Sequence, residues 1–110
     1  MRTPLSLDEY LTKANNYAQQ GDILGMMIAL DTASLWSKHL QQDISTYRTE
    51  IEYNGYTNAL PLILTEAKEY IDQNQINQAQ HCLTEAERYA KIIREDISKE
   101  IKELKNLMYS

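Results

Sequence analysis

Residues 30–50 read LDTASLWSKHLQQDISTYRTE, and residues 83–103 read LTEAERYAKIIREDISKEIKE. The two stretches align without a gap, and the tripeptide Asp-Ile-Ser stands at the same place in both. Extended outward, residues 7–57 align with residues 60–110 at an offset of 53, and fifteen of the 51 pairs are identical. Chance would give roughly three to five identities. A fixed internal period of this kind indicates one supersecondary unit stacked on a copy of itself.

The composition is that of an acidic chain that folds. It has 110 residues, of which 43% are hydrophobic, and a net charge of −5. This size corresponds to one domain, which we expect to cover residues 1–110 and to consist of the repeats 7–57 and 60–110. Neither half is basic, so we expect no binding to nucleic acid, whose phosphates attract clustered Lys and Arg.

The single cysteine, Cys82, excludes an internal disulfide and gives no sign of an oxidising compartment. No signal-peptide segment stands at the N-terminus, and no apolar run approaches the length of a membrane span. The sequence therefore predicts a cytoplasmic protein without a membrane partner.

Apolar residues at spacings of three and four predict a short helix and then a long one in the first repeat. The short helix should cover about residues 7–20, with Ser6 as its N-cap and Gly21 as a left-handed stop. Asp22 should then cap the long helix, which is expected to continue to about residue 53.

The long helix is predicted from a heptad pattern. Its apolar stripe consists of Ile23, Met26, Leu30, Ala33, Ser37, Leu40, Ile44, Tyr47 and Ile51. The pair Asn54 and Gly55 should end it. An alternative breaks both long helices at the Asp-Ile-Ser tripeptides, residues 43–45 and 96–98, because Asp and Ser can cap a helix. The unbroken heptad phase favours the continuous helix.

The second repeat predicts the same pair of helices. Its short helix begins near Leu60 with Pro61 in the first turn, where the missing N–H costs nothing. Asn74 replaces the glycine stop, and a long helix should follow from Ile76. The expected fold class is all-α, with two antiparallel helical hairpins in the order short-long-short-long.

The first part of each repeat resembles a tetratricopeptide-type helical hairpin. The matching positions are Ala14, Tyr17, Gly21, Met26, Leu30 and Ala33 in one copy, and Ala67, Tyr70, Asn74, Ala79, Leu83 and Ala86 in the other. The chain departs from that family where Lys38 and Lys91 replace its proline, and its period is 53 rather than about 34. The resemblance implies a TPR-like or elongated four-helix bundle that binds other polypeptides. A three-helix bundle of the microtubule-interacting-and-trafficking type is an alternative with the same implication.

No residue pattern predicts catalysis, a cofactor or a metal site. The two histidines, His39 and His81, occupy different repeat positions, and neither has an acidic residue three positions before it, as di-iron bundles require. Cys82 is interpreted as a small packing residue. We therefore expect a protein that is not an enzyme. The alternative is a small-ligand-binding or weakly catalytic helical bundle that uses His39, His81 or Cys82.

Two aromatic residues, Trp36 and Tyr89, match each other in the repeat. Packing within the protein is the main interpretation, and contact with a partner protein is the alternative. The basic residues of the last predicted helix alternate with acidic ones, which is typical of a solvated helix face.

A continuous last helix would extend beyond the rest of the bundle. Its apolar side chains would then lie uncovered, and such patches usually mark interfaces. These candidate interface residues are Ile93, Ile97, Ile101, Leu104, Leu107 and Met108. The alternative is a break near Asp96 that folds this segment back onto the core. We expect a non-enzymatic protein–protein interaction module, a small adaptor or assembly subunit that forms a homo-oligomer, as a dimer, through its C-terminal helix and has a further protein partner of unknown identity.

Overall fold

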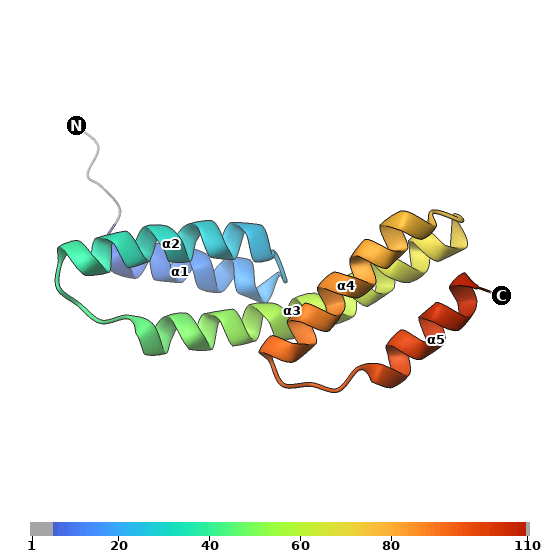
Figure 1. The fold of residues 1–110 in the computed structure, drawn as a ribbon. Helices are drawn as coiled ribbons and strands as arrows, with labels where there is room; N and C mark the ends of the chain where they lie inside the picture. Colours follow the sequence, from blue (N-terminus) through green and yellow to red (C-terminus); the bar gives the residue numbers. More distant parts are fainter. Residues whose placement is uncertain (1–5, 110) are drawn as a thin grey trace. The chain divides into compact units, whose positions relative to one another are not determined.

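The computed structural model describes residues 6–109, and within them it contains five α-helices and no strand (Figure 1). The helices are α1 (Leu7–Gln19), α2 (Ile23–His39), α3 (Ser45–Asp72), α4 (Ile76–Ile92) and α5 (Ser98–Met108). The predicted all-α class is confirmed. The chain divides between Asn58 and Ala59 into two compact units, and α3 contributes one half to each.

The predicted order of short and long helices is wrong. Instead of continuing through the Asp-Ile-Ser tripeptides, α2 ends at His39 and α4 ends at Ile92. In each case a residue with left-handed backbone follows, Gln41 with φ 56° and Arg94 with φ 57°. Across the first break the predicted stripe is only partly buried: Ile44 and Ile51 are buried, whereas Leu40 and Tyr47 are 47% and 60% exposed.

The Asp-Ile-Ser tripeptide acts as a helix start in both repeats. The backbone N–H of Ser45 donates to Asp43 Oδ1 at 2.9 Å, and that of Ser98 donates to Asp96 Oδ1 at 2.9 Å. The bond from the Ser45 backbone lowers the pKa of Asp43. The pKa of Asp96 is lowered by a bond from the Ser98 hydroxyl and then by the bond from the Ser98 backbone. The sequence therefore carried the correct signal, and the capping alternative describes the structure.

The first unit is a bundle of α1, α2 and the first half of α3. A buried cluster joins these helices and consists of Leu7 of α1, Ala33 of α2 and Ile44, which directly precedes α3. Farther along, the side-chain amide of Asn58 donates to the carbonyl of Ala18 at 3.0 Å. All three helices therefore contact one another through side chains.

The second unit uses the second half of α3 with α4 and α5. Its buried side chains include Ala67 of α3, Leu83 of α4 and Ile101 of α5. The side-chain amide of Gln80 donates to the hydroxyl of Tyr109 at 2.9 Å, which joins α4 to the end of α5. Figure 1 shows α5 returning beside the other two helices of this unit.

The helix boundaries recur at the 53-residue offset of the sequence alignment. The bounds of α2 plus 53 are those of α4, and the first residue of α3 plus 53 is that of α5. Gly21 (φ 69°) and Asn74 (φ 58°) are the left-handed residues between the first two helices of each unit, as predicted. Leu30 and Leu83, at equivalent positions, are both buried.

The predicted stop at Asn54 and Gly55 is also wrong, because both residues lie inside α3. Gly55 is buried, and a Cβ placed on it would collide with the sulfur of Met26 and lie 3.4 Å from Cβ of Ala18. Glycine inside a helix costs about 1 kcal/mol relative to alanine. Here it lets α3 approach α2 closely enough for Met26 to be fully buried.

The second unit distributes volume differently at the equivalent contact. Ala79 stands where Met26 stands, and Met108 stands where Gly55 stands. Both Ala79 and Met108 are buried. The large side chain thus lies on the second helix in the first unit and on the third helix in the second unit. The total side-chain volume at the contact stays similar, as close packing requires.

Pro61 also lies within α3 rather than in the first turn of a separate helix. Proline inside a helix removes one backbone hydrogen bond. The hydroxyl of Thr65 donates to the Pro61 carbonyl at 2.9 Å.

We expect the Met26–Gly55 contact to show strong coupling. Met26→Ala should destabilise the protein by roughly 2–5 kcal/mol because it leaves a cavity. Gly55→Met should be more damaging because its side chain overlaps Met26. The combined variant copies the second unit and should be at least about 1 kcal/mol more stable than the sum of the single changes predicts. Urea unfolding of the four proteins measures the coupling, and additive effects would contradict this packing.

The two turn aspartates, Asp43 and Asp96, should make stability depend on acid pH. Their folded-state pKa values are lowered, so their contribution is present at neutral pH and is lost as the pH falls through the ordinary Asp value of 3.8 and then the lowered values. The double variant Asp43→Ala/Asp96→Ala should lower the urea midpoint at pH 7 and show a smaller drop below pH 4. If the urea midpoint falls equally in the wild type and the double variant below pH 4, other carboxylates cause the loss of stability.

Candidate functional site

The helix α2 is apolar on two opposite sides. One side packs inside the first unit through its buried residues, which are Met26, Ala29, Leu30, Ala33 and Ser37. The other side carries Leu24, Ile28 and Leu35, which are 73%, 60% and 69% exposed. At 3.6 residues per turn these three side chains fall within roughly 40° of arc. We call these three residues the α2 stripe.

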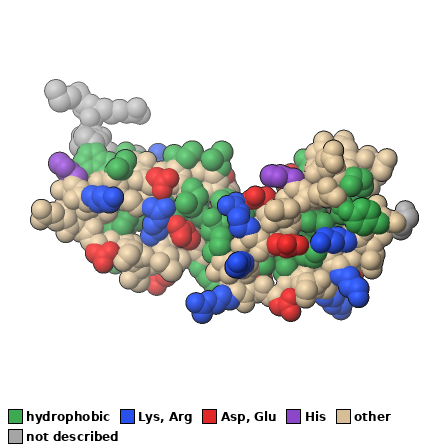
Figure 2. All heavy atoms as spheres, in the orientation of Figure 1, with side chains coloured by type: hydrophobic (Ala, Val, Ile, Leu, Met, Phe, Trp, Pro, Cys, Tyr) green, Lys and Arg blue, Asp and Glu red, His purple; other side chains and the backbone are tan. Residues whose placement is uncertain are grey.

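Figure 2 shows hydrophobic side chains gathered at the surface over α2. A helix that is hydrophobic all round is normally buried on all sides. Here three large aliphatic side chains of α2 are mostly in water, within the first unit as the structure describes it. Packing of α2 within the first unit does not explain these three exposed side chains.

The second repeat provides an internal comparison for this stripe. At the positions of Leu24, Ile28 and Leu35, helix α4 has Asn77, His81 and Arg88, and all three are exposed. The opposite, buried face of α4 keeps its small and aliphatic residues. The scaffold therefore accepts polar residues at these positions, and the aliphatic residues of α2 are not required for the fold.

One carboxylate lies beside the α2 stripe. Asp31 stands between Ile28 and Leu35 along the helix and pairs with the guanidinium of Arg48 at 2.9 Å. Arg48 also donates to Glu52 at 2.9 Å and to the Ser34 hydroxyl at 2.6 Å. The bond to Glu52 and then that to Asp31 raise the pKa of Arg48. Asp31 is thus paired with Arg48, and this pairing lowers the free-energy cost of removing Asp31 from water when a partner covers the α2 stripe.

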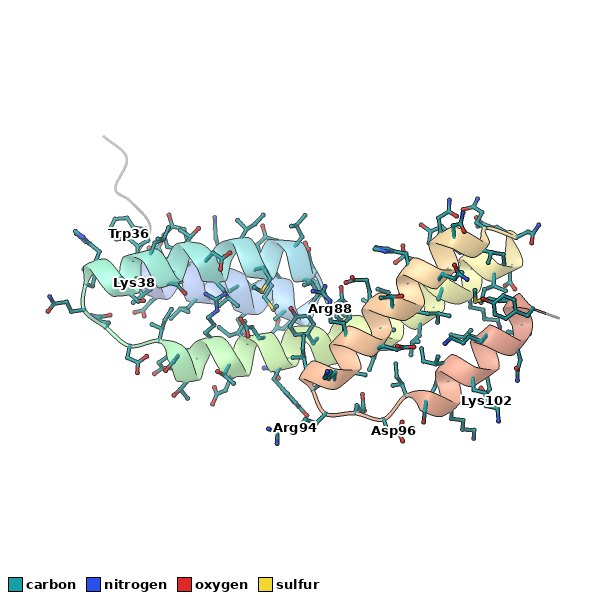
Figure 3. The ribbon with its side chains drawn as sticks, viewed as in Figure 1. Trp36, Lys38, Arg88, Arg94, Asp96 and Lys102 are labelled. Carbon is teal, nitrogen blue, oxygen red and sulfur yellow. The ribbon has the colours of Figure 1, made fainter. Side chains whose placement is uncertain are left out.

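The structure places Trp36 and Tyr89 in the packing of their units. Trp36 is half-buried against the Leu7–Ala33–Ile44 cluster, near the end of α2 (Figure 3), and its ring meets that of His39 edge-on with centroids 6.0 Å apart. Tyr89 is buried and has the Arg88 guanidinium 5.6 Å from its ring centroid. The packing interpretation fits both positions better than contact with a partner.

The six C-terminal candidates do not form an exposed stripe. Ile93, Ile97, Ile101 and Met108 are buried, Leu104 is half-buried, and only Leu107 is exposed. The expectation of an uncovered surface was wrong because it required a continuous last helix. The break at Asp96 lets α5 fold back, which was the alternative prediction.

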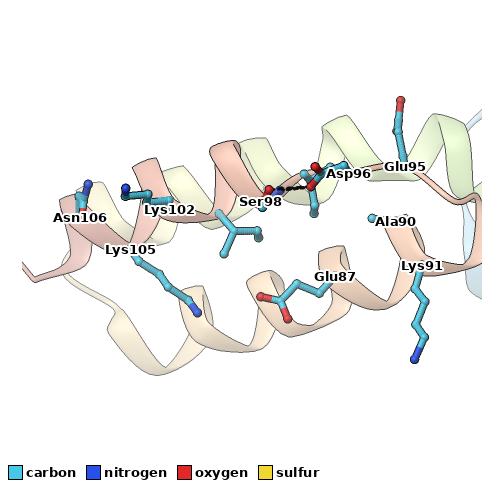
Figure 4. A pocket seen from close by; sticks show the side chains of 11 residues that line it. Glu87, Ala90, Lys91, Glu95, Asp96, Ser98, Lys102, Lys105 and Asn106 are labelled. Carbon is cyan, nitrogen blue, oxygen red and sulfur yellow. Dashed lines mark hydrogen bonds between the residues drawn. The ribbon is translucent and has the colours of Figure 1, made fainter.

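Two of those residues, Ile97 and Ile101, line a hollow of the second unit (Figure 4). It measures about 600 Å³ and lies between α4 and α5, with Ala90, Ile97 and Ile101 as its apolar part and charged side chains at its rim. The first unit has Arg48 at the position of Ile101. A shorter, uncharged side chain thus stands here, where the first unit has a long cationic one held by three hydrogen bonds.

A second hollow brings together two residues of the alternative function. It measures about 300 Å³ and is lined by Glu66, Tyr70, Asn77, Gln78, His81 and Cys82. In the first unit the ring of Tyr17 covers Gly25 so closely that a Cβ there would lie 2.6 Å from it. Gln78 replaces that glycine, so Tyr70 cannot cover α4 in the same way.

The chemistry of this hollow does not favour catalysis. Burial, together with the carboxylates of Glu66 and Glu85, raises the pKa of the Cys82 thiol. A thiol is nucleophilic and binds metals as the thiolate, which this environment disfavours. His39 lies in the other unit, exposed beside Trp36. Within residues 6–109, no three His, Cys, Asp or Glu side chains converge as a metal site.

Comparison with known proteins found no matching family model, no matching curated protein and no matching solved structure. The tetratricopeptide resemblance therefore stays a prediction. Over the described part of the chain, none of the helices combines the length and the apolar character that crossing a membrane requires.

Sequence reasoning missed the α2 stripe. The signal was present, because aligning the two repeats shows Leu24, Ile28 and Leu35 opposite polar residues. The heptad interpretation instead predicted that the exposed apolar surface lies on the C-terminal helix.

Arg48 should stabilise the first unit by joining α2 to α3. We expect Arg48→Met, which keeps an aliphatic side chain but removes the guanidinium, to cost about 1–2 kcal/mol, since it removes three hydrogen bonds that are only partly shielded from water. Thermal and urea unfolding measure this loss. Thr49→Met, at the exposed neighbouring position, is the control and should change stability by less than about 0.5 kcal/mol. Equal effects of the two changes would show that the Arg48 hydrogen bonds do not stabilise the unit.

Proposed function

We propose that this protein is a non-enzymatic protein–protein interaction module, a small adaptor or assembly subunit, and that the α2 stripe is its contact surface. The observation that carries this proposal is the difference between the repeats. At three equivalent exposed positions, one helix has two leucines and an isoleucine and the other has Asn, His and Arg. Exposed aliphatic clusters of this kind mark interaction sites.

The stripe is suited to contact an apolar surface of another polypeptide, either the face of a helix or a groove. Its residues stand at spacings of four and seven, which present a straight apolar ridge about 17 Å long at 1.5 Å per residue. Such a ridge packs against a facing helix or into an apolar groove. It is too short and too weakly charged at its flanks to favour nucleic acid.

This proposal moves the contact surface from α5 to α2. The apolar residues of α5 mostly serve the core of the second unit, whereas those of the α2 stripe do not serve the core of the first. We place the module in the cytoplasm because its cysteine is a free, buried thiol.

A graft from the second repeat tests the proposal. The triple variant Leu24→Asn/Ile28→His/Leu35→Arg gives α2 the exposed residues of α4. We expect its unfolding free energy to stay close to that of the wild type, since all three side chains are exposed. In pull-downs from the native cell extract, proteins retained by the wild type should be lost with the graft.

The matched control is Leu62→Glu, which changes an exposed leucine of α3 to the residue at its repeat equivalent, Glu9. This variant should retain the same proteins as the wild type. If the graft retains them too, or if the control loses them as well, the α2 stripe is not the contact surface.

A further inference from the structure

We infer that the occupant of the α2 stripe is the α2 stripe of a second copy of this chain, packed antiparallel about a two-fold axis. This inference rests on the proposed function and names the partner at the same surface. It follows from the spacing of the apolar side chains and from the distribution of charge along α2.

The spacing is self-complementary. In an antiparallel pair with the axis between Ile28 and Asp31, Leu24 of each copy lies opposite Leu35 of the other. The two Ile28 side chains then flank the axis. Four leucines and two isoleucines, all more than half exposed in the single chain, would cover one another. The contact is isologous, the commonest arrangement in oligomers, because the same patch serves both copies.

The charges of α2 favour the antiparallel direction. Its N-cap is the exposed Asp22, and the exposed Asp31 stands at its midpoint. Its C-terminal end carries the exposed residues His39 and Lys38, the latter labelled in Figure 3. Antiparallel packing brings Lys38 of one copy beside the Asp22 end of the other, and it aligns the helix dipoles favourably. Parallel packing would instead place Lys38 beside Lys38 and Asp22 beside Asp22, whereas the two Asp31 lie close together in either direction.

The Arg48–Asp31 ion pair also supports a second copy of the chain as the partner at the α2 stripe. The chain has a net charge of −5, so two copies repel each other in general. Along the α2 stripe this repulsion is reduced, because Arg48 lies 2.9 Å from Asp31 within each copy. The stripe is therefore a surface where two acidic molecules can meet through apolar contact.

The short ridge implies a reversible dimer rather than a permanent one. Stable interfaces bury about 800 Å² on each partner, and smaller ones are transient. We therefore expect dimerisation to depend on concentration over the micromolar to sub-millimolar range. Sedimentation velocity and light scattering on the wild type should show a monomer at a few micromolar and a growing dimer fraction at several hundred micromolar.

Variants test the surface. The graft Leu24→Asn/Ile28→His/Leu35→Arg should remain monomeric over the whole range, and Leu62→Glu should dimerise like the wild type. A wild type that stays monomeric at several hundred micromolar overturns the inference. So does a graft that dimerises as well as the wild type, because the contact would then lie elsewhere.

Cross-linking tests the direction. In a Cys82→Ala background, which copies Ala29 of the first repeat, Leu24→Cys and Leu35→Cys are made as separate proteins and mixed. Mild oxidation should form the mixed 24–35 disulfide several-fold faster than the 24–24 or 35–35 disulfides, as quantified by peptide mass spectrometry. Faster 24–24 and 35–35 products would overturn the antiparallel arrangement. His81→Cys in the same background measures collisional disulfide formation.

The failures of the two proposals are distinguishable. If the wild type is monomeric but its pull-down partners still depend on the α2 stripe, the second-copy inference fails and the proposed function stands. If the wild type neither dimerises nor retains partners through the stripe, both fail.

Discussion

The Asp-Ile-Ser turn is the constraint on which the rest of this structure depends. A left-handed residue ends the second helix of each unit, and the aspartate then accepts the backbone N–H of the serine that begins the third. Because the chain reverses here, Ile44 and Ile97 are directed into the cores of their units. Without the turn, each repeat would be one hairpin with half of its long helix uncovered. With it, each repeat closes into three helices and buries its apolar residues locally.

Local closure explains why an exposed apolar surface on α2 is informative. In a bundle of three short helices, each helix packs with one side and leaves the other to water, so the outward side is normally polar. Helix α4 follows this rule and α2 does not. The two helices have the same length and occupy equivalent places in their units. Packing within each unit therefore does not account for the difference between their outward faces.

Much of the fold could be predicted from the sequence, and the errors share a cause. Local signals with a definite geometry were read correctly, among them Ser6 and Asp22 as N-caps and Gly21 and Asn74 as left-handed stops. The heptad pattern could not reveal the break, because Ile44 keeps its phase whether or not the helix continues. Gly55 predicts a stop when the sequence is considered alone, because a glycine in sequence does not show that another helix lies against it. The exposed C-terminal stripe was derived from the assumed continuous helix and failed with it.

The exchange of volume between Met26–Gly55 and Ala79–Met108 has a consequence for how such a chain can change. Two repeats of similar sequence invite recombination between them. A crossover that joins the second helix of one unit to the third helix of the other would set methionine against methionine, or alanine against glycine. The first product is overfilled and the second contains a void. The two positions of each pair therefore have to be exchanged together, whereas exposed positions can differ between the units without such a conflict.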